Sequence, residues 1–187
     1  MKEVRKLTIG AVMVSLAVVL TLLSKLIPAP YWLQGGSITL ASAVPIIAVG
    51  IICGTKWGIL SSLVFSIIQI MTGFYPPPTQ TLLYFVLVIL LDYVIAFGVY
   101  GLGGTFYKLM NKKTWAIPVS GAIVVTLRYV CHILSGILIW GVYAPKGEAV
   151  WIYSIVYNGS YMVPEIIINT VVLIVLSKLI KKYAAID

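Results

Sequence analysis

Long apolar runs, separated by short turns, make up almost the whole chain. The six runs lie at residues 7–27, 37–53, 57–72, 81–101, 116–141 and 151–180. Each is close to the roughly 20 residues that a helix needs to cross a hydrocarbon core about 30 Å thick. We therefore predict an all-α membrane protein, a bundle of six transmembrane helices in which residues 1–187 form one integral-membrane domain.

The composition supports this class, and the charges orient the bundle. Hydrophobic residues make up 61% of the chain and charged residues 10%. The net charge of +8 could suggest a nucleic acid partner. The basic residues, however, gather on one side of the predicted bundle, so we expect a lipid bilayer as partner, no nucleic acid, and both termini in the cytoplasm. Ten of the 13 Lys and Arg residues lie on this side: Lys2, Arg5, Lys6, Lys56, Lys108, Lys112, Lys113, Lys178, Lys181 and Lys182.

Three charged residues lie deep inside apolar runs. They are Asp92 in the fourth run, Arg128 in the fifth and Glu165 in the sixth. An unpaired charge in lipid costs at least about 2.5–3.5 kcal/mol, so we expect the three to converge inside the bundle. Their sum is one negative charge, which favours a positively charged ligand. The alternative is that Arg128 bridges both carboxylates as a structural ion pair.

The fifth run carries a stripe of unusual residues. Arg128, His132, Gly136 and Trp140 are each four apart, a spacing that puts them on one face of a helix. Gly136 would leave room where a side chain would block a guest. An aromatic ring such as Trp140 stabilises a nearby cation by about 0.5–2 kcal/mol. The stripe therefore predicts a ligand pocket that opens toward the outer half of the membrane.

The sixth run adds a second polar stripe, and the chain lacks the usual catalytic motifs. Ser154, Asn158, Tyr161 and Glu165 share one helical face, with Tyr153 beside them. The single histidine excludes a His-cluster metal site, and the sequence contains no P-loop, H-E-x-x-H or G-x-S-x-G motif. We expect no metal, no cofactor and no enzymatic activity.

A family resemblance rests on the last two runs. They read Arg128-Tyr-Val-Cys-His132-Ile-Leu-Ser-Gly136-Ile-Leu-Ile-Trp140-Gly-Val-Tyr-Ala-Pro145, followed by Tyr153-Ser-Ile-Val-Tyr-Asn158-Gly. This pattern resembles the thiamine-specific substrate-binding subunit (S-component) of energy-coupling factor (ECF) transporters. The resemblance covers most of the chain. It implies a multi-pass protein of the prokaryotic cell membrane that binds thiamine from outside with high affinity.

The resemblance also implies roles for particular residues. Asp92 would balance the positive thiazolium ring, and Arg128 would pair with that carboxylate. Trp140 and Tyr153 would form stacking walls. The remaining members of the implied site are the polar anchors His132 and Asn158, together with Tyr93, Gly136, Trp32 and Tyr75. Glu165 has no counterpart in the family pattern.

The resemblance further implies protein partners. S-components are energised by a separate module, a transmembrane coupling protein with two cytoplasmic ATPases. This agrees with the missing P-loop. Ala11-x-x-x-Ser15 in the first run resembles the family's docking surface for the coupling protein, and small residues at this spacing permit close helix approach.

Other functions remain open at this point. The same scaffold could serve another vitamin such as riboflavin, and the sequence does not separate thiamine from its phosphates. A solitary proton-coupled carrier could use Asp92, Arg128 and Glu165 as a relay. An intramembrane enzyme could use Asp92 and Glu165 as paired carboxylates, although a neighbouring arginine would keep both ionised.

Overall fold

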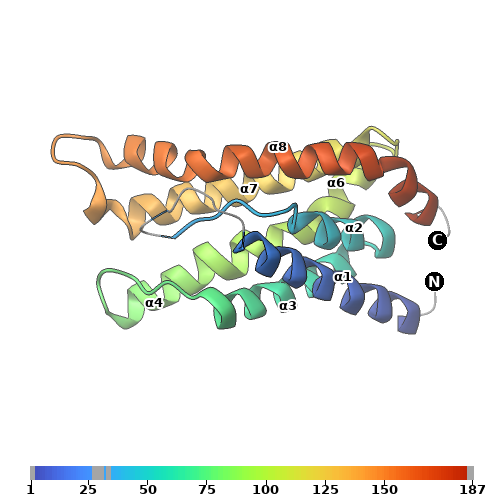
Figure 1. Ribbon diagram of the computed structural model, residues 1–187, viewed down its shortest axis with the longest axis horizontal. Helices are drawn as coiled ribbons and strands as arrows, with labels where there is room; N and C mark the ends of the chain where they lie inside the picture. The colour runs from blue at the N-terminus through green and yellow to red at the C-terminus, as the bar shows by residue number, and fades with distance from the viewer. Residues whose placement is uncertain (1–2, 27–31, 33–34, 185–187) are drawn as a thin grey trace.

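The protein is an elongated bundle of helices (Figure 1). The computed structural model describes residues 3–26, 32 and 35–184. Within them the chain forms α1 (Glu3–Ser24), α2 (Ala43–Cys53), α3 (Thr55–Gly73), α7 (Ala116–Leu138) and α8 (Val150–Ala184). A continuous helix between α3 and α7 runs over Leu82–Leu109. It consists of α4 (Leu82–Val88), η1 (Ile89–Ile95), α5 (Ala96–Gly98), η2 (Val99–Leu102) and α6 (Gly103–Leu109).

The predicted passes are present, but the second differs from the expected helix. Five of the described helices are long and apolar enough to cross a membrane, whereas α2 has 11 residues. α1 begins and α8 ends at the same end of the bundle (Figure 1), as an even number of passes requires. The cytoplasmic location of that end remains a prediction.

The helix predicted over 37–53 begins only at Ala43, and the described residues directly before it are not helical. Gly35 and Gly36 have φ values of 85° and 110°, and Ala41 has a φ of 56°. These left-handed positions interrupt a right-handed helix. Pro45 falls in the first turn of α2, where its missing N–H removes no helical hydrogen bond.

These non-helical residues, 35–42, which we call the extended segment, bury Thr39, Ala41 and Ser42. Within a membrane bundle their backbone polar groups need partners from the protein. Side chains of α1 and α8 supply them. The carboxylate of Glu165 accepts the Thr39 backbone N–H, and Ser24 Oγ accepts the Leu40 N–H at 2.8 Å. The Tyr157 hydroxyl donates to the Gly35 carbonyl, also at 2.8 Å.

Glycines allow α2, α3 and the helix over Leu82–Leu109 to approach one another closely. A β carbon on Gly104 would lie 2.0 Å from the carbonyl oxygen of Gly50, so the backbones of α6 and α2 are in direct contact. A β carbon on Gly101 would lie 2.3 Å from the backbone nitrogen of Ile59 in α3. This close approach packs one half of the bundle tightly. The fourth predicted run ends at Gly101, but the helix continues to Leu109.

Candidate functional site

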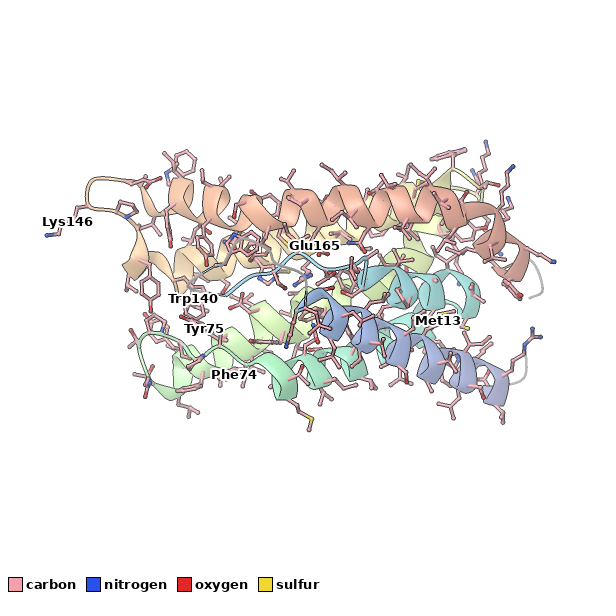
Figure 2. The ribbon with its side chains drawn as sticks, in the orientation of Figure 1. Met13, Phe74, Tyr75, Trp140, Lys146 and Glu165 are labelled. Carbon is pink, nitrogen blue, oxygen red and sulfur yellow. The ribbon has the colours of Figure 1, made fainter. Side chains whose placement is uncertain are left out.

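A cavity of about 180 Å³ lies within the bundle, among side chains from α1, the extended segment, α3, η1, α7 and α8. Figure 2 places two of its wall residues, Tyr75 and Trp140, in the half of the bundle away from the start of α1. Nine of the ten predicted site residues line the cavity: Tyr75, Asp92, Tyr93, Arg128, His132, Gly136, Trp140, Tyr153 and Asn158.

Asp92 is the acidic group of the cavity. It lies in η1, a π-helical stretch of the kind found at functional sites in otherwise α-helical segments. Its Oδ2 accepts hydrogen bonds from Ser135 Oγ at 2.7 Å and Trp140 Nε1 at 3.1 Å. Its Oδ1 lies 3.1 Å from His132 Nδ1. Three groups from α7 and the residues just after it therefore hold the carboxylate in place.

The predicted pairing of Arg128 with Asp92 is wrong, because His132 stands between them. Arg128 Nε donates to His132 Nε2 at 3.1 Å, so Nδ1 is the nitrogen that carries the proton and donates to Asp92. In this neutral form the imidazole joins the two charges without a direct ion pair. Arg128 instead donates through Nη1 to the Tyr100 hydroxyl at 2.7 Å and lies over the Phe97 ring at 4.5 Å.

Gly136 lines the cavity for a reason different from the one predicted. A β carbon there would lie 2.1 Å from Ser154 Oγ and 3.1 Å from Asn158 Nδ2. The space is filled by α8 rather than left for a guest. Gly136 therefore lets α7 and α8 approach closely and shapes the cavity indirectly.

The α8 side of the cavity is held by its own hydrogen bonds. Asn158 Nδ2 donates to the backbone carbonyls of His132 and Ser154 at 3.2 and 2.9 Å. Asn158 Oδ1 accepts from the Tyr161 hydroxyl at 2.5 Å. Asn158 thus ties α8 to α7 and orients Tyr161, another cavity residue. Tyr153 packs against a neighbouring tyrosine, Tyr157, with ring centroids 5.7 Å apart.

Aromatic rings form a rim around the cavity. The rings of Tyr75 and Trp140 have centroids 5.5 Å apart (Figure 2), and Tyr143 stacks on Trp140 with ring centroids 6.4 Å apart. The Tyr93 hydroxyl accepts the backbone N–H of Tyr75 and donates to the Gly73 carbonyl, both at 3.0 Å. Tyr93 therefore fixes the loop that carries Tyr75.

Trp32 and Glu165 lie outside the cavity lining. Trp32 Nε1 donates to Ser160 Oγ at 2.7 Å, and its ring meets Tyr161 edge-on at 5.7 Å. Glu165 is fully buried and accepts hydrogen bonds from the Thr39 N–H and, at 2.9 Å, from Asn169 Nδ2. Arg128 makes a hydrogen bond to neither carboxylate in the described structure but donates to His132 and Tyr100, so the alternative in which it bridges Asp92 and Glu165 is wrong.

Several residues that line the cavity or bind its side chains were not predicted from the sequence. Lys25, Gln69 and Thr72 line it from α3 and the turn after α1. Gln69 is a polar residue in the third apolar run, and this was the signal in the sequence that could have placed α3 at the cavity. Ser135, which binds Asp92, follows His132 by three positions and so shares its helical face. Among the described residues, no group of three or more His, Cys, Asp or Glu could hold a metal ion.

Comparison with known proteins identifies the family. Residues 7–185 match the family described as thiamine transporter protein (Thia_YuaJ). The chain belongs to the thiamine transporter family. It is a membrane transport protein and not an enzyme, as the sequence predicts, and the resemblance stated above is confirmed.

Individual relatives of the thiamine transporter family agree with this assignment. The chain is 34% identical to thiamine transporter ThiT of Bacillus subtilis (strain 168) over 94% of this chain and 91% of that protein. It is also 34% identical to ThiT of Lacticaseibacillus paracasei, over 46% of this chain and 48% of that protein. The solved structure of ThiT from Listeria monocytogenes has a TM-score of 0.75 at 22% identity, covering 98% and 99% of the two chains. The predicted all-α membrane fold is confirmed.

Proposed function

We propose that this chain binds thiamine in the described cavity, with the thiazolium ring beside Asp92. The observation that carries the proposal is the state of that carboxylate. Its hydrogen-bond donors are a serine hydroxyl, an indole N–H and a neutral imidazole. None of them brings a positive charge, and Arg128 reaches the carboxylate only through His132, so a cationic guest would supply a direct countercharge.

The other walls suit the rest of the molecule. Thiamine carries two flat heteroaromatic rings, and Tyr75, Trp140 and Tyr153 offer aromatic faces to them. His132 and Asn158 would act as polar anchors. Because both are already bound within the protein, we assign them a second task, which is to hold Asp92 and Tyr161 in position. Trp32 would act through Tyr161, which it contacts.

Thiamine binding to the purified protein in detergent tests this proposal. Asp92→Asn keeps the shape of the side chain and removes its charge, so we expect thiamine affinity to fall at least about 100-fold, the loss of a buried charge-assisted contact. Asp92→Glu restores the charge and should recover much of the affinity. Glu148→Gln, which removes an exposed acid from the loop before α8, is the matched control. Unchanged affinity in Asp92→Asn would refute the assignment.

A ligand panel on the same protein decides the substrate class. We expect thiamine to bind far more tightly than riboflavin, since riboflavin lacks the fixed positive charge that would pair with the Asp92 carboxylate. Tight riboflavin binding would favour the other-vitamin alternative. Uptake into liposomes that contain this chain alone, driven by a pH gradient, would favour the solitary carrier.

We also propose that the chain works as the S-component of an ECF transporter, energised by a coupling protein and two ATPases. The support is the sequence resemblance and the surface of α1. Ala11 and Ser15 are exposed. Ser15 Oγ donates to the Ala11 carbonyl at 3.0 Å, so the hydroxyl already has a hydrogen-bond acceptor within α1. Two small residues one turn apart leave a shallow patch that another helix could approach closely.

Co-purification with the coupling protein tests the docking face. Ala11→Leu together with Ser15→Leu should abolish the complex while leaving thiamine binding intact. Leu16→Phe also enlarges an exposed side chain, on a different side of α1, and serves as the control. A complex that survives the double substitution would move the docking face elsewhere.

A further inference from the structure

An apolar groove runs between the first half of α7 and the second half of α8, away from the residues that line the thiamine cavity. It encloses about 450 Å³. Residues from Pro118 to Leu127 form its α7 wall, and Thr170 and Ile174 form its α8 wall. Such a groove on the outside of a membrane bundle faces lipid.

Two residues beyond the groove, one on each helix, lie on the same helical faces as its walls. One is a lysine and the other a tryptophan. On α8, Lys181 lies seven positions after Ile174, which is two turns or about 10 Å along the same face. On α7, Trp115 precedes Pro118 by three residues and continues that face at the start of the helix. Trp115 is 54% exposed, in keeping with the interfacial position that tryptophan favours.

Lysines gather where the groove meets the end of the bundle at which α1 begins and α8 ends. Lys181 Nζ donates to the Lys112 carbonyl at 2.8 Å, which places the end of α8 against the turn between α6 and α7. The Tyr107 hydroxyl donates to the same carbonyl at 3.0 Å and helps to fix the turn. The side chains of Lys112 and Lys113 are exposed on it. We call Lys112, Lys113 and Lys181 the lysine cluster.

The described acidic residues do not offset the lysine cluster. Glu3 forms an ion pair with Lys6 of its own helix at 3.3 Å. Asp92 and Glu165 lie inside the bundle, and Glu148 belongs to the loop between α7 and α8 at the other end. Asp187 lies outside the described residues. The positive charge of the cluster is therefore available to an anion from outside the described chain.

We propose that the groove and the lysine cluster together bind one anionic phospholipid of the phosphatidylglycerol type. One acyl chain lies in the groove between α7 and α8. The phosphate is bound by the lysine cluster, and Trp115 lies at the level of the headgroup. Basic pockets between transmembrane helices bind anionic headgroups in this way. The long apolar groove selects a lipid over a soluble anion, because its contacts need a hydrocarbon chain.

Native mass spectrometry of the whole protein, titrated with phosphatidylglycerol and phosphatidylcholine of identical acyl chains, tests the headgroup. We expect one phosphatidylglycerol to bind at least about tenfold more tightly than phosphatidylcholine. Lys113→Gln together with Lys181→Gln should weaken phosphatidylglycerol about 25-fold, which is about fivefold for each lysine. Arg5→Gln with Lys56→Gln removes the same charge from the same end of the bundle, away from the groove, and should have no comparable effect.

Ala122→Phe tests the groove itself, because it fills the space between the walls and leaves the lysines in place. It should weaken both lipids. Equal retention of the two lipids by the wild type, or equal effects of the two charge-removing pairs, would overturn the proposal. Thiamine affinity should be unchanged in all of these variants, so failure here is distinguishable from failure of the thiamine assignment.

Discussion

Trp140 lies two residues beyond the end of α7, yet its indole Nε1 is 3.1 Å from Asp92 Oδ2 and 3.0 Å from Ser135 Oγ. The chain leaves the helix and the indole turns back toward the acid. One side chain thus contributes both an aromatic wall and a hydrogen bond to the carboxylate. The ring contacts two tyrosines, Tyr75 and Tyr143, which limits its freedom to turn away.

Trp140→Phe separates these two contributions, because it keeps an aromatic ring and removes the donor. A hydrogen bond to a charged group contributes about 1.5–3 kcal/mol, so we expect thiamine affinity to fall roughly 10- to 100-fold by isothermal titration calorimetry. Tyr143→Phe keeps the stack on the rim and is the control. A loss no greater than that of the control would mean that the indole N–H does not support the binding geometry of Asp92.

Gly136→Ala tests whether glycine at this position serves helix packing. The new methyl group would overlap Ser154 Oγ, and overpacking of this kind costs about 1–3 kcal/mol. We expect a lower melting temperature in detergent and weaker thiamine binding. Combining it with Ser154→Gly should recover part of both, a positive coupling that a double-mutant cycle measures.

The control for this experiment is Gly98→Ala, since a β carbon on Gly98 would make only an ordinary contact of 3.8 Å with Leu63. If Gly136→Ala were as stable as the control but unable to bind thiamine, the glycine would be making room for the ligand after all. The original sequence-based interpretation would then be correct.

Glu165 is predicted to hold the extended segment rather than the ligand. Glu165→Leu leaves the Thr39 N–H buried without an acceptor, which costs about 1–3 kcal/mol. We expect a lower melting temperature and weaker thiamine binding, since Gly35 and Gly36 of the same segment line the cavity. Glu165→Gln keeps one oxygen for Thr39 and should be milder in both measurements. Equal effects of the two substitutions would show that charge, not the acceptor, is what matters.

The sequence predicts much of this arrangement because its signals are local. The spacing of Arg128, His132 and Gly136 places them on one helical face, and the structure does bring their positions to one cavity. Length and hydropathy alone identify five of the long helices. Each of these inferences depends on residues within a few turns of one another.

The remaining features depend on contacts between distant parts of the chain. Residues 37–42 belong to an apolar run, and their extended shape requires partners more than 100 positions away, such as Glu165. The π-helical stretch around Asp92 and the imidazole between Arg128 and Asp92 likewise follow from how η1 and α7 pack. The helical period alone does not show that His132 lies between Arg128 and Asp92.

The central position of His132 leads to a last prediction, that Arg128 influences thiamine through the imidazole. Arg128 Nε donates to the nitrogen opposite the one that donates to Asp92, and so fixes which nitrogen carries the proton. Arg128→Gln and His132→Gln should each weaken thiamine binding, and the double variant should be little worse than His132→Gln alone. Tyr100→Phe, which removes only the far contact of Arg128, is the control. Losses that simply add would mean that Arg128 acts on the ligand independently of His132.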